Sequence, residues 1–324
     1  MAITPIDTTL QMVAEVLEFY AKNEVGNAIA TSNAFLSMLL KNTKGGLRRV
    51  PGGRQITERV ILLEDANSQW YSGVEPLNTV QSDAIREAVF TWKQAAGSIV
   101  VSGIDMRNAS ADKFSKSNLI NDIKTQVDTT VKQLVGQGIW NPAPAANEIS
   151  SVPNFVDDTT VVGGLDPVTY PLWASSVTPS LTTVPALSGS ELLDDMEALY
   201  NTIMSNSGKA PNCVVAGPTL YTKYGRACQE LKRFSAETRY RADIGFSGYD
   251  FNQAFFCLDG YCPANELYML NTEDFKLNVH KDAFFTFTPM RMREDEDAYY
   301  SRVLFQGELS IKNRKTQGKI VYTV

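Results

Sequence analysis

The chain has 324 residues, of which 44% are apolar and 20% are charged, and its net charge is −6. This is the composition of a globular protein, and the acidic balance excludes nucleic-acid binding by bulk charge. No apolar run reaches the roughly 18 residues of a membrane span, and the first residues lack the basic leader and apolar core of a secretory signal. Four cysteines are few for this length and fit a reducing compartment.

The N-terminal part is expected to hold a helix and then a basic segment. Apolar residues at helical spacing predict an amphipathic helix over residues 8–22, and a second apolar stretch covers 34–40. Residues 41–54 combine four glycines with five basic residues and no acidic one, which predicts a hinge-like linker. The alternative is a basic arm that contacts nucleic acid or acidic groups of a neighbouring subunit. The basic residues are Lys41, Lys44, Arg48, Arg49 and Arg54.

Two β-rich runs, residues 54–63 and 84–101, flank a polar connection of about 20 residues, whereas a hairpin loop usually has about 2–5. A two-stranded ribbon cannot bury enough apolar surface to be stable alone, so its apolar side chains need a partner. A neighbouring copy of the chain is the simplest one, with contacts predicted at Val60, Leu62, Trp70 and Tyr71. The aromatic residues could also stack on nucleic-acid bases, but few basic residues lie between them.

The middle of the chain alternates predicted helices with irregular structure. Residues 110–135 predict the longest helix, roughly 38 Å, with one apolar stripe that includes Leu134, and Gly136 and Gly138 are expected to end it. Residues 140–188 predict irregular structure with short strands. Ser188 and Glu191 form a capping-box pattern for a helix whose apolar stripe begins at residue 192.

The C-terminal half is predicted to become β-rich. A short buried strand over 213–216 is followed by a helix from Pro218 to about residue 234. Strands are predicted over 254–258, 266–270, 275–280, 284–288, 300–311 and 319–324. Because helices and strands neither alternate cleanly nor separate cleanly, the predicted fold class is α+β.

Catalytic and metal-binding patterns are weak. His280 is the only histidine, and the sequence has neither a nucleophile-elbow nor a phosphate-loop motif. The spacing of the four cysteines does not match the usual zinc pairs, so free thiols are expected. The acidic run Glu294, Asp295, Glu296 and Asp297 lacks the spacing of a calcium loop. It is expected to be a solvated loop, which could also pair with Arg48, Arg49 or Arg54 of another subunit.

Two segments near the end of the chain carry its most specific local pattern, LNTEDFKLNVHKDAFFTFTPMRM and YYSRVLFQGELSIKNRKTQGKI. A strand pair of this kind closes with a turn of asparagine, two basic residues and glycine, here Asn313, Arg314, Lys315 and Gly318. With the order of segments, these features resemble the major capsid proteins of tailed bacteriophages, which have the Hong Kong 97-like fold. The resemblance implies an N-terminal arm (1–50), an extended E-loop (51–100), a peripheral domain with a long spine helix and a β-sheet (101–137 and 275–324) and an axial domain (138–274).

The resemblance also implies a structural function without enzymatic activity or cofactor. Many copies would assemble into hexamers and pentamers of an icosahedral shell that encloses double-stranded DNA, bound non-specifically. The protein would belong to the virion capsid, assembled in the host bacterial cytoplasm without a membrane, with a portal and a possible cement protein as partners. Only about 50 residues precede the E-loop, so a separate scaffolding protein is expected.

One departure from the family concerns covalent crosslinking. No lysine occurs from Gly45 to Trp92, so the E-loop cannot supply the amine that crosslinks subunits in the family archetype. The shell is expected to depend on buried area, intertwined arms, charge pairs or an auxiliary protein instead. The alternatives are an encapsulin-type bacterial nanocompartment, which shares the fold, and a hydrolase, for which the sequence offers one histidine and no motif.

Overall fold

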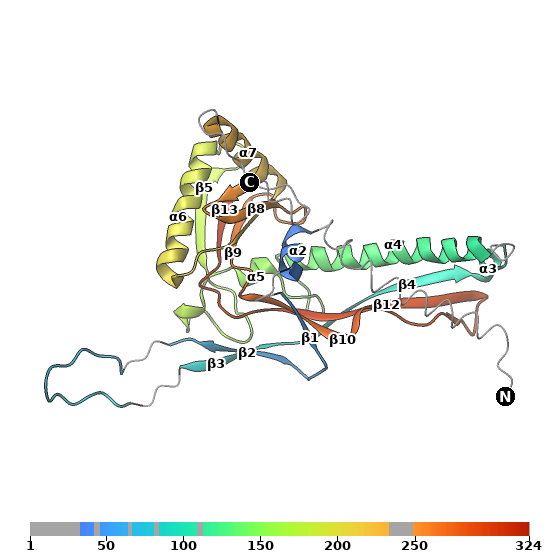
Figure 1. Cartoon of the computed structure of the whole chain (residues 1–324), viewed down its shortest axis with the longest axis horizontal. Helices are drawn as coiled ribbons and strands as arrows, with labels where there is room; N and C mark the ends of the chain where they lie inside the picture. Colours follow the sequence, from blue (N-terminus) through green and yellow to red (C-terminus); the bar gives the residue numbers. More distant parts are fainter. Residues whose placement is uncertain are drawn as a thin grey trace.

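The computed structural model describes residues 33–41, 46–63, 67–80, 84–108, 113–232 and 249–323. The helix predicted over residues 8–22, Lys44 and the side chain of Lys41 lie outside this description. The described part is α+β, as predicted, with a five-stranded sheet, a six-stranded sheet and a two-stranded ribbon (Figure 1). In Figure 1 helix α4 (Lys113–Trp140) and strands β4 (Lys93–Ser102) and β12 (Ala298–Ile311) extend to one side, and the ribbon projects to the other.

The five-stranded sheet is built on two long strands, β10 (Phe275–Phe287) and β12 (Ala298–Ile311), which pair antiparallel. Strand β4 (Lys93–Ser102) and the short β11 (Arg291–Met292) also pair with β12, and β1 (Gly46–Val50) runs parallel to β10. The basic segment is therefore not only a linker, because part of it completes a sheet. The two strands predicted over 275–280 and 284–288 are one strand, with a register shift between Val279 and Phe284.

Helix α4 (Lys113–Trp140) packs on β4 and is longer than predicted. It continues through Gly136 and Gly138, so the prediction that these glycines end it is wrong. A Cβ atom at Gly138 would lie 2.9 Å from Cγ2 of Ile149, so the glycine permits close packing inside the helix. The buried side of the last turns carries Val131, Val135 and Ile139, whereas Leu134, predicted on the apolar stripe, is 52% exposed.

Two short helices precede α4 in the sequence. Helix α2 (Ala34–Lys41) begins after Asn33, whose side-chain oxygen accepts a hydrogen bond from the backbone N–H of Leu36 at 2.8 Å. Helix α3 (Gly103–Asn108) follows β4 directly and precedes α4 in the sequence.

The six-stranded sheet has the order β5-β13-β9-β6-β8-β7 and packs against helices α6 (Gly189–Ser207) and α7 (Pro218–Lys232). The predicted capping box is confirmed, since Ser188 and Glu191 bond each other's backbone N–H, and the predicted stripe of α6 is buried. The strands are β5 (Ser176–Thr183), β6 (Cys213–Ala216), β7 (Tyr249–Phe251), β8 (Ala254–Leu258), β9 (Glu266–Leu270) and β13 (Gly318–Thr323).

Strand β13 departs from the predicted grouping of segments. The predicted segment 275–324 groups it with β10 and β12, but it pairs with β5 and β9 in the six-stranded sheet. The turn between β12 and β13 therefore joins the two sheets. The short helix α5 (Val152–Phe155) and the 3₁₀ helix η2 (Pro171–Trp173) lie on the connection from α4 to β5.

The ribbon consists of β2 (Ile56–Ile61), β3 (Ile85–Phe90) and the residues that connect them. The predicted run over 84–101 is split after Phe90, because β3 pairs with β2 whereas β4 pairs with β12. Two kinds of structure thus follow each other within one apolar run, and only the first belongs to the ribbon. We call β2 and β3 the ribbon root and residues 67–80 the ribbon tip.

Candidate assembly surfaces

The ribbon root belongs to the core of the chain itself. Alternate residues of each strand face inward, and the ring of Phe90 lies edge-on to that of Phe155, with 5.9 Å between the centroids. Val60 and Leu62, predicted to contact a neighbouring subunit, are only 8% and 1% exposed. For these two residues the prediction of a contact with a neighbouring subunit is wrong, because the body of their own chain covers that face of the ribbon.

The ribbon tip, in contrast, presents apolar side chains to solvent. Of the sixteen large apolar side chains exposed in the described part of the chain, five lie in the ribbon tip: Trp70, Tyr71, Val74, Leu77 and Val80. Trp70 is fully exposed, at 102%, and Tyr71 is 64% exposed. An exposed apolar cluster of this kind typically marks an interaction site. Contacts of Trp70 and Tyr71 with a neighbouring subunit remain a prediction that this exposure favours.

The ribbon tip has hydrogen bonds of its own. The side chain of Asn67 bonds both backbone groups of Val80: its Nδ2 donates to the carbonyl at 2.6 Å, and its Oδ1 accepts from the N–H at 3.0 Å. Further along, Gln69 Nε2 donates to the carbonyl oxygen of Pro76 at 3.3 Å. These bonds link residues thirteen and seven positions apart on the two sides of the tip. They give the loop that carries the apolar side chains a defined conformation.

A buried acidic residue anchors the ribbon root to the five-stranded sheet. Glu58 of β2 lies 3.5 Å from Arg48 Nη1 on β1 and 3.4 Å from Lys276 Nζ on β10. The predicted basic segment therefore contributes Arg48 to an ion pair within the chain. Arg49 lies over the ring of Phe284, 5.9 Å from its centroid, and Arg54 is exposed. The role of these residues towards DNA or another subunit remains a prediction.

The acidic run lies in an exposed turn between β11 and β12. Asp297 pairs with Arg107 of α3, with 2.5 Å between Oδ2 and Nη2, and this hydrogen bond raises the pKa of the arginine. Glu296 pairs with Arg293 within the turn. Two of the four predicted contact residues thus have partners in their own chain, while Glu294 and Asp295 border a cleft of about 610 Å³ with Arg291 and Arg302.

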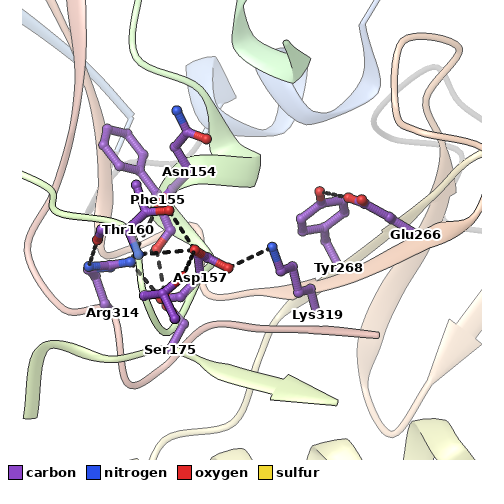
Figure 2. Close-up of polar contacts among 10 residues, drawn as sticks. Asn154, Phe155, Asp157, Thr160, Ser175, Glu266, Tyr268, Arg314 and Lys319 are labelled. Carbon is purple, nitrogen blue, oxygen red and sulfur yellow. Dashed lines mark hydrogen bonds and ion pairs between the residues drawn. The ribbon is translucent and has the colours of Figure 1, made fainter. Parts of the chain in front are cut away.

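The sequence did not reveal that Arg314 is buried. Figure 2 shows its guanidinium group among the backbone carbonyls at the end of α5 and in the loop that follows it. Nε donates to Phe155 O at 2.8 Å, Nη1 to Thr160 O at 3.0 Å, and Nη2 to Asp157 O at 2.6 Å and Asn154 O at 3.4 Å. Burial lowers the pKa of Arg314 to about 10, so the group stays charged at neutral pH. Only its place in the turn noted above could have drawn attention to it.

An ion pair completes this network. Asp157 Oδ1 lies 3.0 Å from Nζ of Lys319 on β13 (Figure 2). Burial acts to raise the pKa of Asp157, but hydrogen bonds from Thr160, Lys319 and Thr159 and the charge of Lys319 outweigh it and lower the pKa to about 2. The loop after α5 is therefore fixed to β13 by charge and to the β12–β13 turn by the carbonyl bonds of Arg314.

A second buried charge lies under the loop that follows α4. Glu308 of β12 accepts a hydrogen bond from the backbone N–H of Ser150 at 2.9 Å. Its other carboxylate oxygen and the side-chain oxygen of Asn278, which faces it on β10, have no hydrogen-bond partner among the described residues. Burial raises the pKa of Glu308 to about 7, because the charged form lacks solvation.

A Glu308→Gln substitution is expected to stabilise the unassembled subunit at high pH. The pKa of Glu308 is higher in the folded than in the unfolded state, so its proton favours folding, and this stability is lost as pH rises from about 4.5 to about 7. At pH 8 the glutamine variant should be more stable by about 1–3 kcal/mol, and at pH 4, below both pKa values, the difference should nearly vanish. Urea unfolding at both pH values measures this. The exposed control Glu294→Gln should show no such trend, and an equal effect of Glu308→Gln at both pH values would contradict the prediction.

The described residues offer little for catalysis or metal binding. They hold no group of three or more histidine, cysteine or carboxylate side chains placed to bind a metal ion. The four cysteines all lie in the described part of the chain and form no disulfide with one another. The ring of His280 lies 6.2 Å from that of Trp92, and its Nδ1 accepts the backbone N–H of Asp282. None of the described helices combines the length and hydropathy that a membrane span requires.

Comparison with solved structures identifies the fold. The capsid asymmetric unit of cyanophage A-1(L) matches with a TM-score of 0.62 at 12% identity, over 89% of this chain and 92% of that one. The capsid of a native GTA particle matches with a TM-score of 0.59 at 7% identity, over 89% and 91%. The SrpI encapsulin complex of Synechococcus elongatus PCC 7942 matches with a TM-score of 0.50 at 11% identity, over 85% and 84%. No protein-family model and no curated protein matches the sequence.

The chain therefore has the Hong Kong 97-like fold of tailed-phage capsid proteins, as the sequence resemblance predicted. The likeness extends over about nine tenths of the chain and involves both sheets, so it is a likeness of the whole architecture. The matched structures are those of shell-forming proteins, and the identities are too low to carry a function across.

Proposed function

We propose that the chain is the major capsid protein of a tailed phage. Many copies form hexamers and pentamers of an icosahedral shell that encloses double-stranded DNA. The exposed apolar ribbon tip on a capsid fold is the observation that carries this proposal. In an isolated subunit the apolar surface of the tip stays in contact with water, whereas burying it would lower the free energy by roughly 25 cal/mol per Å². In a shell, each tip lies on a neighbouring subunit.

The ribbon divides this task between its two parts. The root is held in the core by Phe90 and by the ion pairs of Glu58, so its position is defined by the subunit itself. The ribbon projects from the body of the subunit (Figure 1), and Trp70 and Tyr71 in its tip are exposed and free to contact the neighbouring subunit. With no lysine from Gly45 to Trp92, the contact is non-covalent, and it depends on buried area and shape.

The other partners follow from the same proposal. A separate scaffolding protein, a portal and a cement protein serve the shell, which assembles in the bacterial cytoplasm and becomes the virion capsid. Arg48, Arg49 and Arg54 face the genome or a neighbouring subunit. Glu294 and Asp295 offer the complementary charge, since their neighbours Glu296 and Asp297 already have partners in the chain.

An encapsulin-type compartment is the second candidate, and the match to the SrpI encapsulin complex favours it. That TM-score of 0.50 is lower than the 0.62 for the cyanophage capsid, so we place the phage capsid first. The two candidates share the shell and the ribbon contact. They differ in what the shell encloses, which is DNA in one case and a cargo enzyme in the other.

Electron microscopy of the purified full-length protein, together with analysis of what copurifies with it, tests the proposal. We expect closed shells whose size is that of a genome container, either empty or filled with nuclease-protected DNA. Small shells filled with a copurifying protein would favour the encapsulin. A small soluble oligomer at every concentration, with no closed particle, would overturn both candidates.

A further inference from the structure

The loop over residues 154–165 touches the ribbon at its root. The backbone N–H of Val89 on β3 donates to the carbonyl oxygen of Gly163 at 2.9 Å. Gly163 has a φ of +62°, and a Cβ atom there would lie 2.7 Å from Cβ of Ala88 and 3.2 Å from the nitrogen of Val89. The loop therefore lies in backbone contact with β3, at a distance that only glycine permits.

The same loop is fixed on its far side. Arg314 binds four of its carbonyl oxygens, and Lys319 pairs with Asp157, so the loop is attached to the turn and strand that join the two sheets (Figure 2). Nε1 of Trp173 donates to the carbonyl of Val162 at 3.2 Å, next to the contact point. A segment held by so many bonds does not adapt to the ribbon, and the ribbon must adapt to it.

The direction of the ribbon is sensitive to this contact. A two-stranded ribbon has little stability of its own. From Leu62 to the far end of the tip the chain has about 12 residues, which reach at most roughly 40 Å when fully extended at about 3.3 Å per residue. A rotation of roughly 3° at the root would then move the far end by up to roughly 2 Å, which is enough to disturb a packed contact.

We propose that residues 154–165 form a strut that sets the direction in which the ribbon leaves the subunit. Gly163 is the contact point, and Arg314 and Lys319 are the positioning residues that hold the strut. The consequence for assembly rests on the proposed function, in which the ribbon tip binds a neighbouring subunit. The contact itself is a property of the single subunit and can be measured without assembly.

The test compares Gly163→Ala with Gly164→Ala in the full-length protein. Both glycines have positive φ, +62° and +78°, so both variants carry a similar backbone cost. Only Gly163 meets the ribbon, because nothing lies within 4 Å of a Cβ atom built at Gly164. In the unassembled subunit we expect the amide of Val89 to exchange with solvent at least about tenfold faster in Gly163→Ala than in Gly164→Ala. We also expect Gly163→Ala to form fewer or malformed shells, and Gly164→Ala to assemble as the wild type does.

A compensating change sharpens the test. The nearest atom to the added methyl group is Cβ of Ala88, so Ala88→Gly combined with Gly163→Ala should restore part of the slow exchange and of the assembly. Should Gly163→Ala fail to fold, Lys319→Met releases the strut from Asp157 without touching the ribbon. It should also speed the exchange of Val89, and an unchanged rate would overturn the proposal.

The outcomes separate the strut from the proposed function. Equal exchange at Val89 in the two glycine variants overturns the strut, whatever happens to assembly. Faster exchange with normal shells overturns the role of the strut in assembly if Trp70→Ala blocks assembly. If Trp70→Ala also assembles normally, the strut contact is supported and the ribbon is not an assembly element, so the proposed function fails instead.

Discussion

A Trp70→Ala substitution is expected to weaken assembly severely while the isolated subunit keeps its stability. Trp70 is fully exposed, so the folded subunit loses no packing when the indole is removed. In the proposed shell the same side chain is buried by a neighbour, where a tryptophan anchor typically contributes about 2–4 kcal/mol. Since about 1.4 kcal/mol corresponds to a tenfold change in an equilibrium constant, the subunit concentration needed for shells should rise roughly 30- to 1000-fold.

Sedimentation over a range of subunit concentrations measures this threshold, and urea unfolding of the unassembled subunit supplies the stability. Trp70→Phe keeps an apolar ring and should restore most of the assembly. Val168→Ala, at an exposed valine outside the ribbon, serves as a surface control for the valine change Val74→Ala in the tip. Shell formation by Trp70→Ala at the wild-type concentration would show that the tip is not an interface anchor.

Local sequence signals predicted much of the fold. Strands β8 and β9 have the predicted bounds, and the capping box of Ser188 and Glu191 starts α6 as expected. These features depend on short-range spacing, on turn residues and on a cap, all of which lie within a few residues of each other. The helix that begins at Pro218 is of the same kind.

The errors arose where distant segments meet. The sequence predicts a single run over 84–101, because an apolar run does not show that its two parts pair with different strands. The division after Phe90, where β3 pairs with β2 and β4 pairs with β12, could therefore not be predicted. The sequence predicts that Gly138 ends its helix, because no local pattern shows that Ile149 packs against this glycine. Burial of Val60 and Leu62 depends on the body beneath the ribbon, and no local pattern reveals which face of a ribbon is covered.

Of the candidate assembly surfaces, one part could be predicted from the sequence and another could not. The exposed aromatic tip could be predicted, since a long polar connection with Trp70 and Tyr71 has no obvious partner within the chain. The strut could not. Its contacts join Gly163 to Val89 and Arg314 to Thr160, which lie far apart in the sequence. The sequence also does not show whether an arginine is buried or exposed to solvent. When a buried polar side chain bonds backbone carbonyls in place of water, only the folded structure reveals these bonds.

Replacement of Arg314 is expected to destabilise the subunit strongly. Arg314→Met keeps most of the side-chain volume but removes every donor, so all four carbonyls lose a hydrogen bond in a buried place. Those of Phe155 and Asp157 keep one bond each from Ser175, whereas those of Asn154 and Thr160 lose the bond from Arg314. Each unsatisfied buried group costs about 1–3 kcal/mol, and partial relaxation of the loop limits the sum to about 3–5 kcal/mol. This is a large part of the roughly 5–15 kcal/mol that stabilises a typical domain.

Arg314→Lys should recover only part of this loss, because one ammonium group cannot reach four carbonyls that surround a planar guanidinium. Lys315→Met is the matched control: it removes a positive charge from the next residue, which is only half-buried, and should change stability by less than about 0.5 kcal/mol. Urea unfolding of the unassembled subunits at pH 7 gives the three values. A loss below about 1 kcal/mol for Arg314→Met would mean that water replaces the guanidinium without cost, and that the loop over residues 154–165 is not held by this side chain.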